Sequence, residues 1–535
     1  MAAITGALTS VNLMGNQLGD EGWGAIFAAI CSNKDSKIMS MDASSENIGP
    51  AGVKLIAEAL RTSVTGSLAL ANLLGNQLDV ESAKMLAEVA KQKGISLCGI
   101  RRDQTTADFS NQGLREGHAI LLASDLSQAG VTGALIQFSI YGNHVGDEGV
   151  GAICEAIQSN KETQLATINM GQIGIGPVGA KSVAAMVAVT STLTECNVRG
   201  NFLDSESAKK LAKIGNEKGT MLFGIKRDQK EANFANLGLG PADAILISSD
   251  LAIGALTVVN LLGNRLDAES AKTLAEIAKQ KGISLCGIRR DQTNADFFGN
   301  GLQPPDAILL ASDLSQAVVT GSLKVTDLLH NQLDAESAKM LAEVAKQKGI
   351  SLCGIQRSQT TADFSKQSLK PPDAMLLASD LSQAGVTGAL THLSLVDNIK
   401  LGDEGVEALS VAIEQSMSLS KLDLSNSVSS TIFGPKGATA LAKALAINSS
   451  LTQIEYVPPD SYLPNVDNSL PAPELFRHPL VPCAFWCLCL QVAGQLPWWE
   501  GCQSGRRRLA CQQLAQEGKF PYVSLSAHIR MTPLS

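Results

Sequence analysis

The sequence predicts an α/β solenoid built from about fourteen tandem strand–helix repeats, and three observations lead to this fold. The first is length, because 535 residues exceed the ~250–300 residues at which a single core usually stops growing. The second is composition, because aromatic residues make up only 4%, and small or medium apolar side chains suit stacked columns better than one large core. The third is self-similarity along the chain.

Long segments of the chain recur almost unchanged. KMLAEVAKQKGISLCGI begins at Lys84 and again at Lys339, a close variant begins at Lys272, and SDLSQAGVTGAL begins at Ser124 and at Ser379. A finer pattern, here the frame, lies within these segments. It reads ϕ-x2-ϕ-x-ϕ-x2-Asn-x-ϕ, where ϕ is an apolar residue and x is any residue. The Asn position of this frame, with some substitutions, falls at 16, 46, 76, 112, 143, 173, 201, 237, 264, 300, 331, 367, 398 and 427.

One repeat illustrates the physics of the unit. The alternation of Leu256, Val259 and Leu261 predicts a short strand. Asn264 turns the chain out of that strand, and its side chain can bond backbone groups that would otherwise lack partners. Residues 269–280 then place apolar side chains at helical spacing. Because one repeat cannot bury its apolar edge alone, stacked repeats are expected to form a horseshoe with strands on the concave face and helices on the convex face.

Three segments resemble a known family. GNQLGDEGWGAIFAAI from Gly15, GNHVGDEGVGAICEAI from Gly142 and LGDEGVEALSVAI from Leu401 are similar to the ribonuclease-inhibitor type of leucine-rich repeat. That type also forms the repeat domains of NOD-like receptors and Ran GTPase-activating proteins. The resemblance covers roughly residues 4–457. It implies a protein-binding scaffold or sensor, regulatory or innate-immune-like, or alternatively a GTPase-activating regulator of a small Ran-like GTPase, because this fold does not specify one function.

Two outward positions of each predicted strand line the concave face, because side chains between the apolar positions must point away from the core. The first position, four residues before the Asn position, is always Asn, Asp or Ser. The second position, two residues before the Asn position, carries several large apolar residues. Apolar groups exposed beside polar ones mark interfaces. The candidate partner-binding residues are Asp108, Tyr141, Arg199, Leu262, Asp296, Phe298, Asp327, Leu329 and Asp363.

The same face admits two interpretations. In the first, Tyr141, Arg199 and Phe298 are anchors of a protein interface, and the six Asp residues at the first position favour a basic partner. In the second, the polar column serves solubility and local hydrogen bonding. The sequence alone leaves both open.

Four repeats are longer than the rest. In these repeats, which start from the Asn positions 76, 201, 264 and 331, the next Asn position follows after 36 residues. This spacing is about 7 residues more than in a typical unit of this class. The excess lies between the helix and the next strand, at 97–103, 222–228, 285–291 and 352–358. We expect bulges on one rim that either bind a partner or are solvated turns with a local Arg–Asp pair. The basic candidates on this rim are Arg101, Arg102, Lys226, Arg227, Arg289, Arg290 and Arg357.

The sequence predicts no enzyme. None of the six His residues stands in a nucleophile arrangement, and the cysteine spacing does not match a zinc site, so no catalytic, cofactor-binding or metal-binding residue is predicted. Acidic pairs such as Asp147-Glu148 open predicted helices, where they favour the positive end of the helix dipole. A net charge of −8 argues against a nucleic-acid partner, and no apolar run reaches the ~18 residues of a membrane span.

The remaining expectations concern location and the ends of the chain. The start lacks the features of a signal peptide, and Cys98, Cys286 and Cys353 repeat one predicted buried position, so a cytoplasmic protein is expected. The repeat array is assigned to residues 1–457. Residues 458–535 form a Pro-, Cys- and Trp-rich tail that is predicted to be mostly disordered. Neither end of the array shows a polar capping unit, which leaves end-to-end self-association open.

Overall fold

The structure is a computed structural model that describes residues 8–13, 15–426 and 432–455. The predicted tail, 458–535, lies outside the described residues, so its disorder stays a prediction. The chain divides into two compact units. Unit 1 comprises Met1–Ala232, Gly238–Thr257 and Asn264–Ile277. Unit 2 comprises Asn233–Leu237, Val258–Gly263 and Ala278–Ser535.

Each repeat begins with a strand of three residues. Parallel pairing joins β1-β2-β3 and β4-β5-β6-β7 in unit 1, and β10-β11 and β12-β13-β14-β15 in unit 2. The fifteen strands of the described chain are β1 (Ser10–Asn12), β2 (Ser40–Asp42), β3 (Leu70–Asn72), β4 (Thr106–Asp108), β5 (Gln137–Ser139), β6 (Thr167–Asn169), β7 (Glu195–Asn197), β8 (Glu231–Asn233), β9 (Val258–Asn260), β10 (Asn294–Asp296), β11 (Val325–Asp327), β12 (Thr361–Asp363), β13 (His392–Ser394), β14 (Lys421–Asp423) and β15 (Gln453–Glu455).

A helix of 11 to 14 residues follows each of the first fourteen strands, which confirms the predicted number of repeats. These helices are α1 (Gly19–Ser32), α2 (Pro50–Arg61), α3 (Val80–Lys93), α4 (Glu116–Leu126), α6 (Gly146–Ser159), α7 (Pro177–Val189), α8 (Ser205–Lys218), α9 (Pro241–Ile253), α10 (Ala268–Lys281), α11 (Pro304–Ser315), α13 (Ala335–Lys348), α14 (Pro371–Leu381), α16 (Gly402–Gln415) and α17 (Pro435–Ile447). Three four-residue helices complete the described set: α5 (Ala129–Thr132), α12 (Ala317–Thr320) and α15 (Ala384–Thr387).

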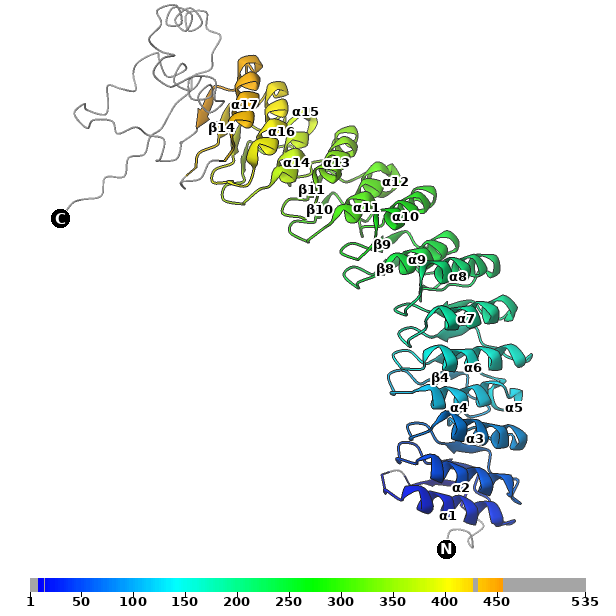
Figure 1. Cartoon of the computed structure of the whole chain (residues 1–535). Coiled ribbons are helices and arrows are strands. Elements are labelled where there is room, and N and C mark those ends of the chain that lie inside the picture. Colours follow the sequence, from blue (N-terminus) through cyan, green and yellow to red (C-terminus); the bar gives the residue numbers. More distant parts are fainter. Residues whose placement is uncertain (1–7, 14, 427–431, 456–535) are drawn as a thin grey trace, which may run out of the picture. The chain divides into compact units, whose positions relative to one another are not determined.

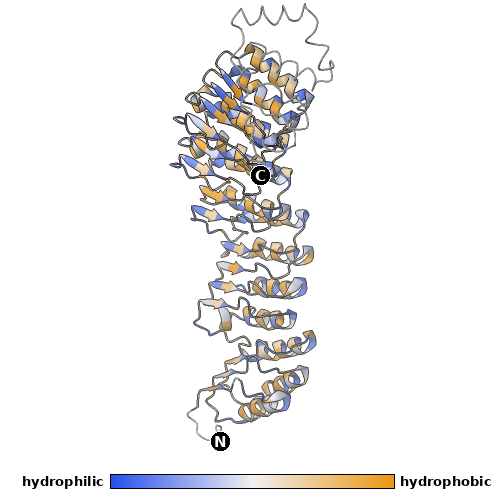
Figure 2. Cartoon of the chain, turned by 90° about the vertical axis from the view of Figure 1, so that its left-hand side faces the viewer, coloured by the Kyte–Doolittle hydropathy of each residue, from blue (hydrophilic) through white to orange (hydrophobic). Residues whose placement is uncertain are grey.

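Within each unit the strands form one layer and the helices a second layer, and the core lies between them (Figures 1 and 2). The apolar positions of the frame point into this core. Phe138 and Ile140 of one repeat and Val259 and Leu261 of another are almost completely buried. None of the helices in the described ranges combines the length and apolarity needed to cross a membrane.

The Asn that ends the frame is buried and bonds two neighbouring repeats together. The Oδ1 atom of Asn143 accepts hydrogen bonds from the N–H groups of Gln112 (3.1 Å) and Leu114 (2.9 Å). Its Nδ2 atom donates to the carbonyls of Phe109 (2.9 Å) and Ile140 (2.7 Å). Related bonds are made by Asn76, Asn201, Asn331 and Asn398. The predicted role of this residue in satisfying backbone groups is confirmed.

The acidic pairs at helix starts act on the following helix as well as on their own. Asp147 in α6 accepts a hydrogen bond of 2.6 Å from the N–H of Gly176, which is the N-cap of α7. Two other pairs make the same bond, Asp20 to Gly49 and Asp403 to Gly434. A Cβ atom on Gly179 would lie 2.5 Å from the Asp147 carboxylate, so glycine is needed there. Each Asp therefore supplies the cap that the next helix lacks.

Strand-to-strand pairing stops at four places in the described chain: after β3, β7, β9 and β11. These are the four long repeats. There the inserted segment bridges to the preceding strand in place of the next strand, at Leu70–Ser96, Glu195–Met221, Val258–Ser284 and Val325–Ser351. We call these places the seams, and residues 95–100, 220–225, 283–288 and 350–355 the seam segments.

The prediction that the inserted residues bulge from a rim is wrong for their apolar half. Leu352, Cys353 and Ile355 are at most 2% exposed, because the seam segment occupies the position of a strand. Only the turn that follows is exposed, and a glutamine fixes it. Gln359 accepts a hydrogen bond from the N–H of Gln356 (3.1 Å) and donates to the carbonyl of Thr361 (2.8 Å). Gln104, Gln229 and Gln292 do the same at the other seams.

Candidate partner-binding face

The strand-bearing face of each unit, here the strand face, corresponds to the predicted concave face. Its acidic candidates Asp108, Asp296 and Asp363 are exposed at the ends of β4, β10 and β12. Each carboxylate also accepts a hydrogen bond from the N–H two residues later, as in Phe298 to Asp296 at 2.9 Å. Bonds from Ser110 and Ser365 lower the pKa of Asp108 and Asp363. Local hydrogen bonding therefore accounts for this residue type, while the charges stay accessible.

Two of the predicted apolar contacts are wrong. Leu262 is 5% exposed and Leu329 is 1% exposed, so neither side chain can touch a partner. Both follow the strand that precedes a seam. There the seam segment lies against the strand end, because Cys286 bridges to Asn260 and Cys353 bridges to Asp327. The sequence places these leucines correctly on the outward side of the strand, but the seam segment covers that side.

Phe298 remains a surface residue, and a histidine accompanies it. Its side chain is 47% exposed, and its ring centroid lies 4.7 Å from that of His330 with the planes inclined by 53°. The His330 backbone has φ +63°, and its N–H donates to Asp373 at 3.0 Å. The sequence reasoning missed His330. A non-glycine residue at a repeat position where glycine is frequent, in a left-handed turn, is the signal that could have found it.

Several carboxylates lie near this aromatic pair. Asp327, at the end of β11, is half-buried and accepts a hydrogen bond from the N–H of Leu329 (3.1 Å). Burial raises the pKa of Asp327, the nearby Asp296 and Asp373 raise it further, and His330 opposes them. We call Asp296, Phe298, Asp327 and His330 the Phe298 patch. All four belong to unit 2.

The other two predicted anchors lie in unit 1. Tyr141 and Arg199 are half-buried and follow β5 and β7. Between them is Gly171, where an added Cβ atom would meet the Tyr141 ring at 3.0 Å and the Arg199 carbonyl at 3.1 Å. The Arg199 guanidinium lies 5.9 Å from the centre of the Phe223 ring. Glycine thus lets the tyrosine ring rest on the backbone, and the arginine is held over a seam segment.

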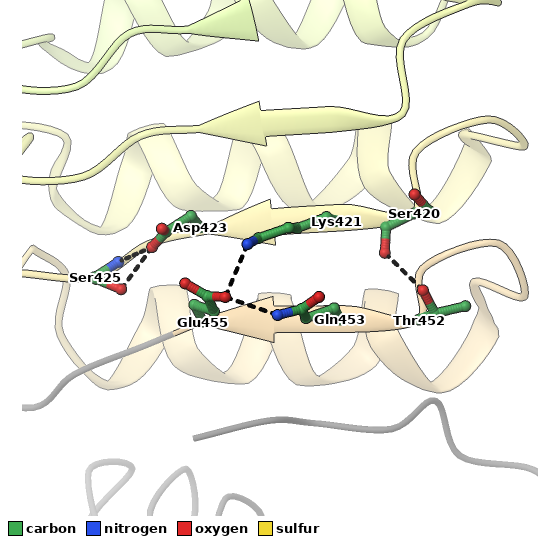
Figure 3. A network of polar contacts seen from close by, with 7 residues as sticks. All are labelled: Ser420, Lys421, Asp423, Ser425, Thr452, Gln453 and Glu455. Carbon is green, nitrogen blue, oxygen red and sulfur yellow. Dashed lines mark hydrogen bonds and ion pairs between the residues drawn. The ribbon is translucent and has the colours of Figure 1, made fainter. Parts of the chain in front are cut away.

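At β14 and β15 the strand face is occupied by its own polar contacts (Figure 3). Lys421 pairs with Glu455 at 2.9 Å, and Gln453 donates to the same carboxylate at 2.7 Å. Asp423 accepts hydrogen bonds from the N–H and the hydroxyl of Ser425. The charged side chains of this region already pair or form hydrogen bonds with their neighbours. It therefore offers a partner fewer unpaired charges than the Phe298 patch does.

The predicted basic rim is exposed throughout. Arg101, Arg102, Lys226, Arg227, Arg289, Arg290 and Arg357 all lie in the turns that follow the seam segments. Arg227 and Arg357 donate to the carbonyls of Gly219 and Gly349, the C-caps of α8 and α13. Part of the basic rim therefore caps its own helices, and its role in binding stays a prediction.

Comparisons with known proteins found one family model, a sequence relative and a solved structure that match parts of the chain. A family model described as leucine-rich repeat matches residues 8–27 and 390–410. Ribonuclease inhibitor from Mus musculus is 22% identical over 369 residues, which is 60% of this chain and 76% of the relative. An internalin from Listeria monocytogenes is 14% identical with a TM-score of 0.23, covering 80% of this chain and 93% of the internalin.

The stacked strand–helix units and the buried asparagines form a leucine-rich-repeat fold, and the leucine-rich-repeat model matches two segments of it. In sequence the chain is similar to ribonuclease inhibitor, in agreement with the resemblance of its sequence motifs.

Proposed function

We propose that the protein is a binding scaffold, not an enzyme, and that it holds a protein partner on the strand face of unit 2. Leucine-rich-repeat proteins generally act as protein-binding scaffolds. The observation that carries this proposal is the Phe298 patch. Its aromatic side chain is 47% exposed on a layer of short strands, contacts the His330 ring and has Asp296 and Asp327 at the ends of the two paired strands beside it. Aromatic side chains in such settings are frequent anchors of interfaces.

The chemistry of the Phe298 patch favours a partner that presents a basic side chain. A Lys or Arg head group gains from the face of an aromatic ring and from nearby carboxylates. Asp296 and Asp327 lie at the ends of adjacent, paired strands, so both can face one cation. The six cysteines of the described chain are free and buried, which supports a cytoplasmic setting.

The test is affinity capture with the full-length chain, followed by measurement of Kd for the captured protein. Phe298→Ala is compared with the wild type. Phe202→Ala is the matched control, because Phe202 is 78% exposed and lies in the other unit. We expect Phe298→Ala to weaken binding by about 30-fold, the effect of losing an interface anchor, and Phe202→Ala to leave Kd unchanged.

The fold must survive for this comparison to hold. Phe298→Ala removes a half-exposed ring and its contact with His330, so we expect a loss of only about 1 kcal/mol in the free energy of unfolding. If Phe298→Ala binds the captured protein as tightly as the wild type, the Phe298 patch is not the site. The strand face of unit 1 around Tyr141 and the basic rim would then be tested in turn.

A further inference from the structure

The helix after each seam carries two side chains that replace the missing strand pairing. They are seven residues apart, which is about two helical turns, so both lie on one face of the helix. Their positions were not singled out by any motif. The four pairs are His118 with Asp125, Asp243 with Asp250, Asp306 with Asp313, and Asp373 with Asp380. We call the second member of each pair the lock carboxylate.

The lock carboxylate holds the backbone of the seam segment. Asp380 in α14 accepts hydrogen bonds from the N–H groups of Leu352 (2.8 Å) and Cys353 (3.0 Å) and from the Ser351 hydroxyl (2.7 Å). Asp125 and Asp313 have the same three partners at their seams, and Asp250 has the two backbone partners. A β-strand would normally use such N–H groups to pair with the next strand.

The first member of each pair holds the turn on the other side of the seam. Asp373 accepts hydrogen bonds from the N–H of His330 (3.0 Å), which follows β11, and from that of Lys370 (2.9 Å), the N-cap of α14. Asp306 makes the equivalent bonds to Gly263 and Gln303. At the first seam His118 contacts the carbonyl of Asn76 (3.0 Å). One helix therefore ties together both sides of each interruption.

No basic group compensates the lock carboxylate of the described seams. Asp380 is 0% exposed. The buried side chains of the adjacent α13 and α16 are uncharged. The Thr387 hydroxyl of the four-residue helix α15 donates to the backbone carbonyl of Asp380, and the seam segment contributes the thiol of Cys353. The titratable neighbours of the other locks are also acidic: Cys98 for Asp125, Glu195 for Asp250, and Cys286 for Asp313.

We propose that the four seams are pH-responsive joints of the array, at which the strand layer opens more readily once the lock carboxylate is charged. A hydrogen-bonded carboxylate that is buried without a cation costs free energy that opening to water recovers. In the described chain, the junctions that join paired strands through a neutral asparagine use no buried carboxylate in its place. The seams therefore differ from these asparagine junctions both in their backbone pairing and in their buried charge.

The direction of the effect follows from the pKa values. Burial raises the pKa of Asp125, Asp250 and Asp380 from 3.8 to about 7, and that of Asp313 to about 6, against the hydrogen bonds that lower it. Between pH 4 and pH 7 the closed seam therefore binds more protons than an opened, hydrated seam. The closed state is favoured at mild acidity, and this advantage is lost as the pH rises through the pKa of the closed state.

Hydrogen exchange at single amides of the full chain tests the proposal without any substitution. The Leu352 amide bonds to the Asp380 carboxylate at 2.8 Å, and the Leu369 amide bonds to the Asn398 side chain at 3.0 Å. Both amides belong to buried residues of unit 2. Of their two acceptors, only the Asp380 carboxylate can ionise. After correction for chemical exchange, we expect the protection of Leu352 to fall about tenfold or more between pH 5 and pH 8, and that of Leu369 to stay constant.

Two variants sharpen the result. Asp380→Asn keeps the shape of the lock without the charge, so the protection of Leu352 should become independent of pH. Asp334→Asn removes an exposed N-cap carboxylate of α13 and should leave the pH dependence intact. Equal pH dependence at Leu352 and Leu369 in the wild type would overturn the proposal. So would a seam amide that at pH 8 is better protected than the asparagine-bound amide.

Discussion

Unit 2 joins neighbouring repeats in two different ways. Between β12 and β13 the strands pair directly, and Asn398 bonds the backbone of both repeats. Between β11 and β12 the strands do not pair, and Asp380 holds a seam segment instead. The helices pack against one another at both junctions, α14 on α16 and α13 on α14. The helix layer therefore carries the continuity of the array, while the strand layer can be interrupted wherever its N–H groups find another acceptor.

The two junctions also differ in how they respond to solvent conditions. The amide of Asn398 both donates and accepts hydrogen bonds and carries no charge, so it satisfies carbonyls and N–H groups alike. The carboxylate of Asp380 in its charged form only accepts, and burial raises its pKa to about 7. We therefore expect a junction built on the amide to be insensitive to pH, and one built on the carboxylate to respond to it.

The largest effect is expected from Asn398→Ala. The substitution leaves the Leu369 N–H and the carbonyls of Phe364 and Leu395 without their partner, and unpaired buried groups cost about 1–3 kcal/mol each, not fully additively. We expect the free energy of unfolding in urea to fall by about 3 kcal/mol, equally at pH 5 and pH 8. A loss below about 1 kcal/mol would mean that water replaces the amide.

Asp380→Ala should cost less, and the cost should depend on pH. At pH 5 the substitution leaves the Leu352 and Cys353 N–H groups without an acceptor, and we expect a loss of about 2 kcal/mol. At pH 8 it also removes a buried charge, because the pKa of Asp380 in the folded protein is about 7, so the loss should be smaller. Urea denaturation at both pH values measures it. If Asp380→Ala lowered the free energy of unfolding more at pH 8 than at pH 5, the proposed difference between seams and asparagine junctions would be contradicted.

The smallest effect is expected from Gln359→Ala, which removes the side chain that fixes the turn after the seam. Its two hydrogen bonds, to Gln356 and Thr361, lie near the surface, where water can substitute, so we expect a loss of about 1 kcal/mol. Gln356→Ala is the control, because that side chain is exposed, and should change stability by less than about 0.5 kcal/mol. Thermal unfolding of the two variants compares them.

Part of the candidate site could be predicted because it depends on local geometry. The period of two along a strand puts Asp296 and Phe298 on the outward side, and the structure leaves both exposed. Leu262 and Leu329 follow the same rule but are covered by seam segments that lie more than twenty residues later in the chain. His330 joins Phe298 through a neighbouring repeat. Burial and ring contacts of this kind depend on distant residues, which periodicity does not report.

The sequence by itself determined the repeat, the number of repeats and the role of the asparagine, because each follows from hydrophobic period and from backbone groups that need partners within one repeat or its neighbour. Only the tertiary structure decided where the strand layer is interrupted. The long repeats were visible as insertions, and Asp373 and Asp380 were visible as residues. The structural role of these insertions and carboxylates depends on whether the next strand pairs with the preceding one. That pairing is determined by how whole repeats stack.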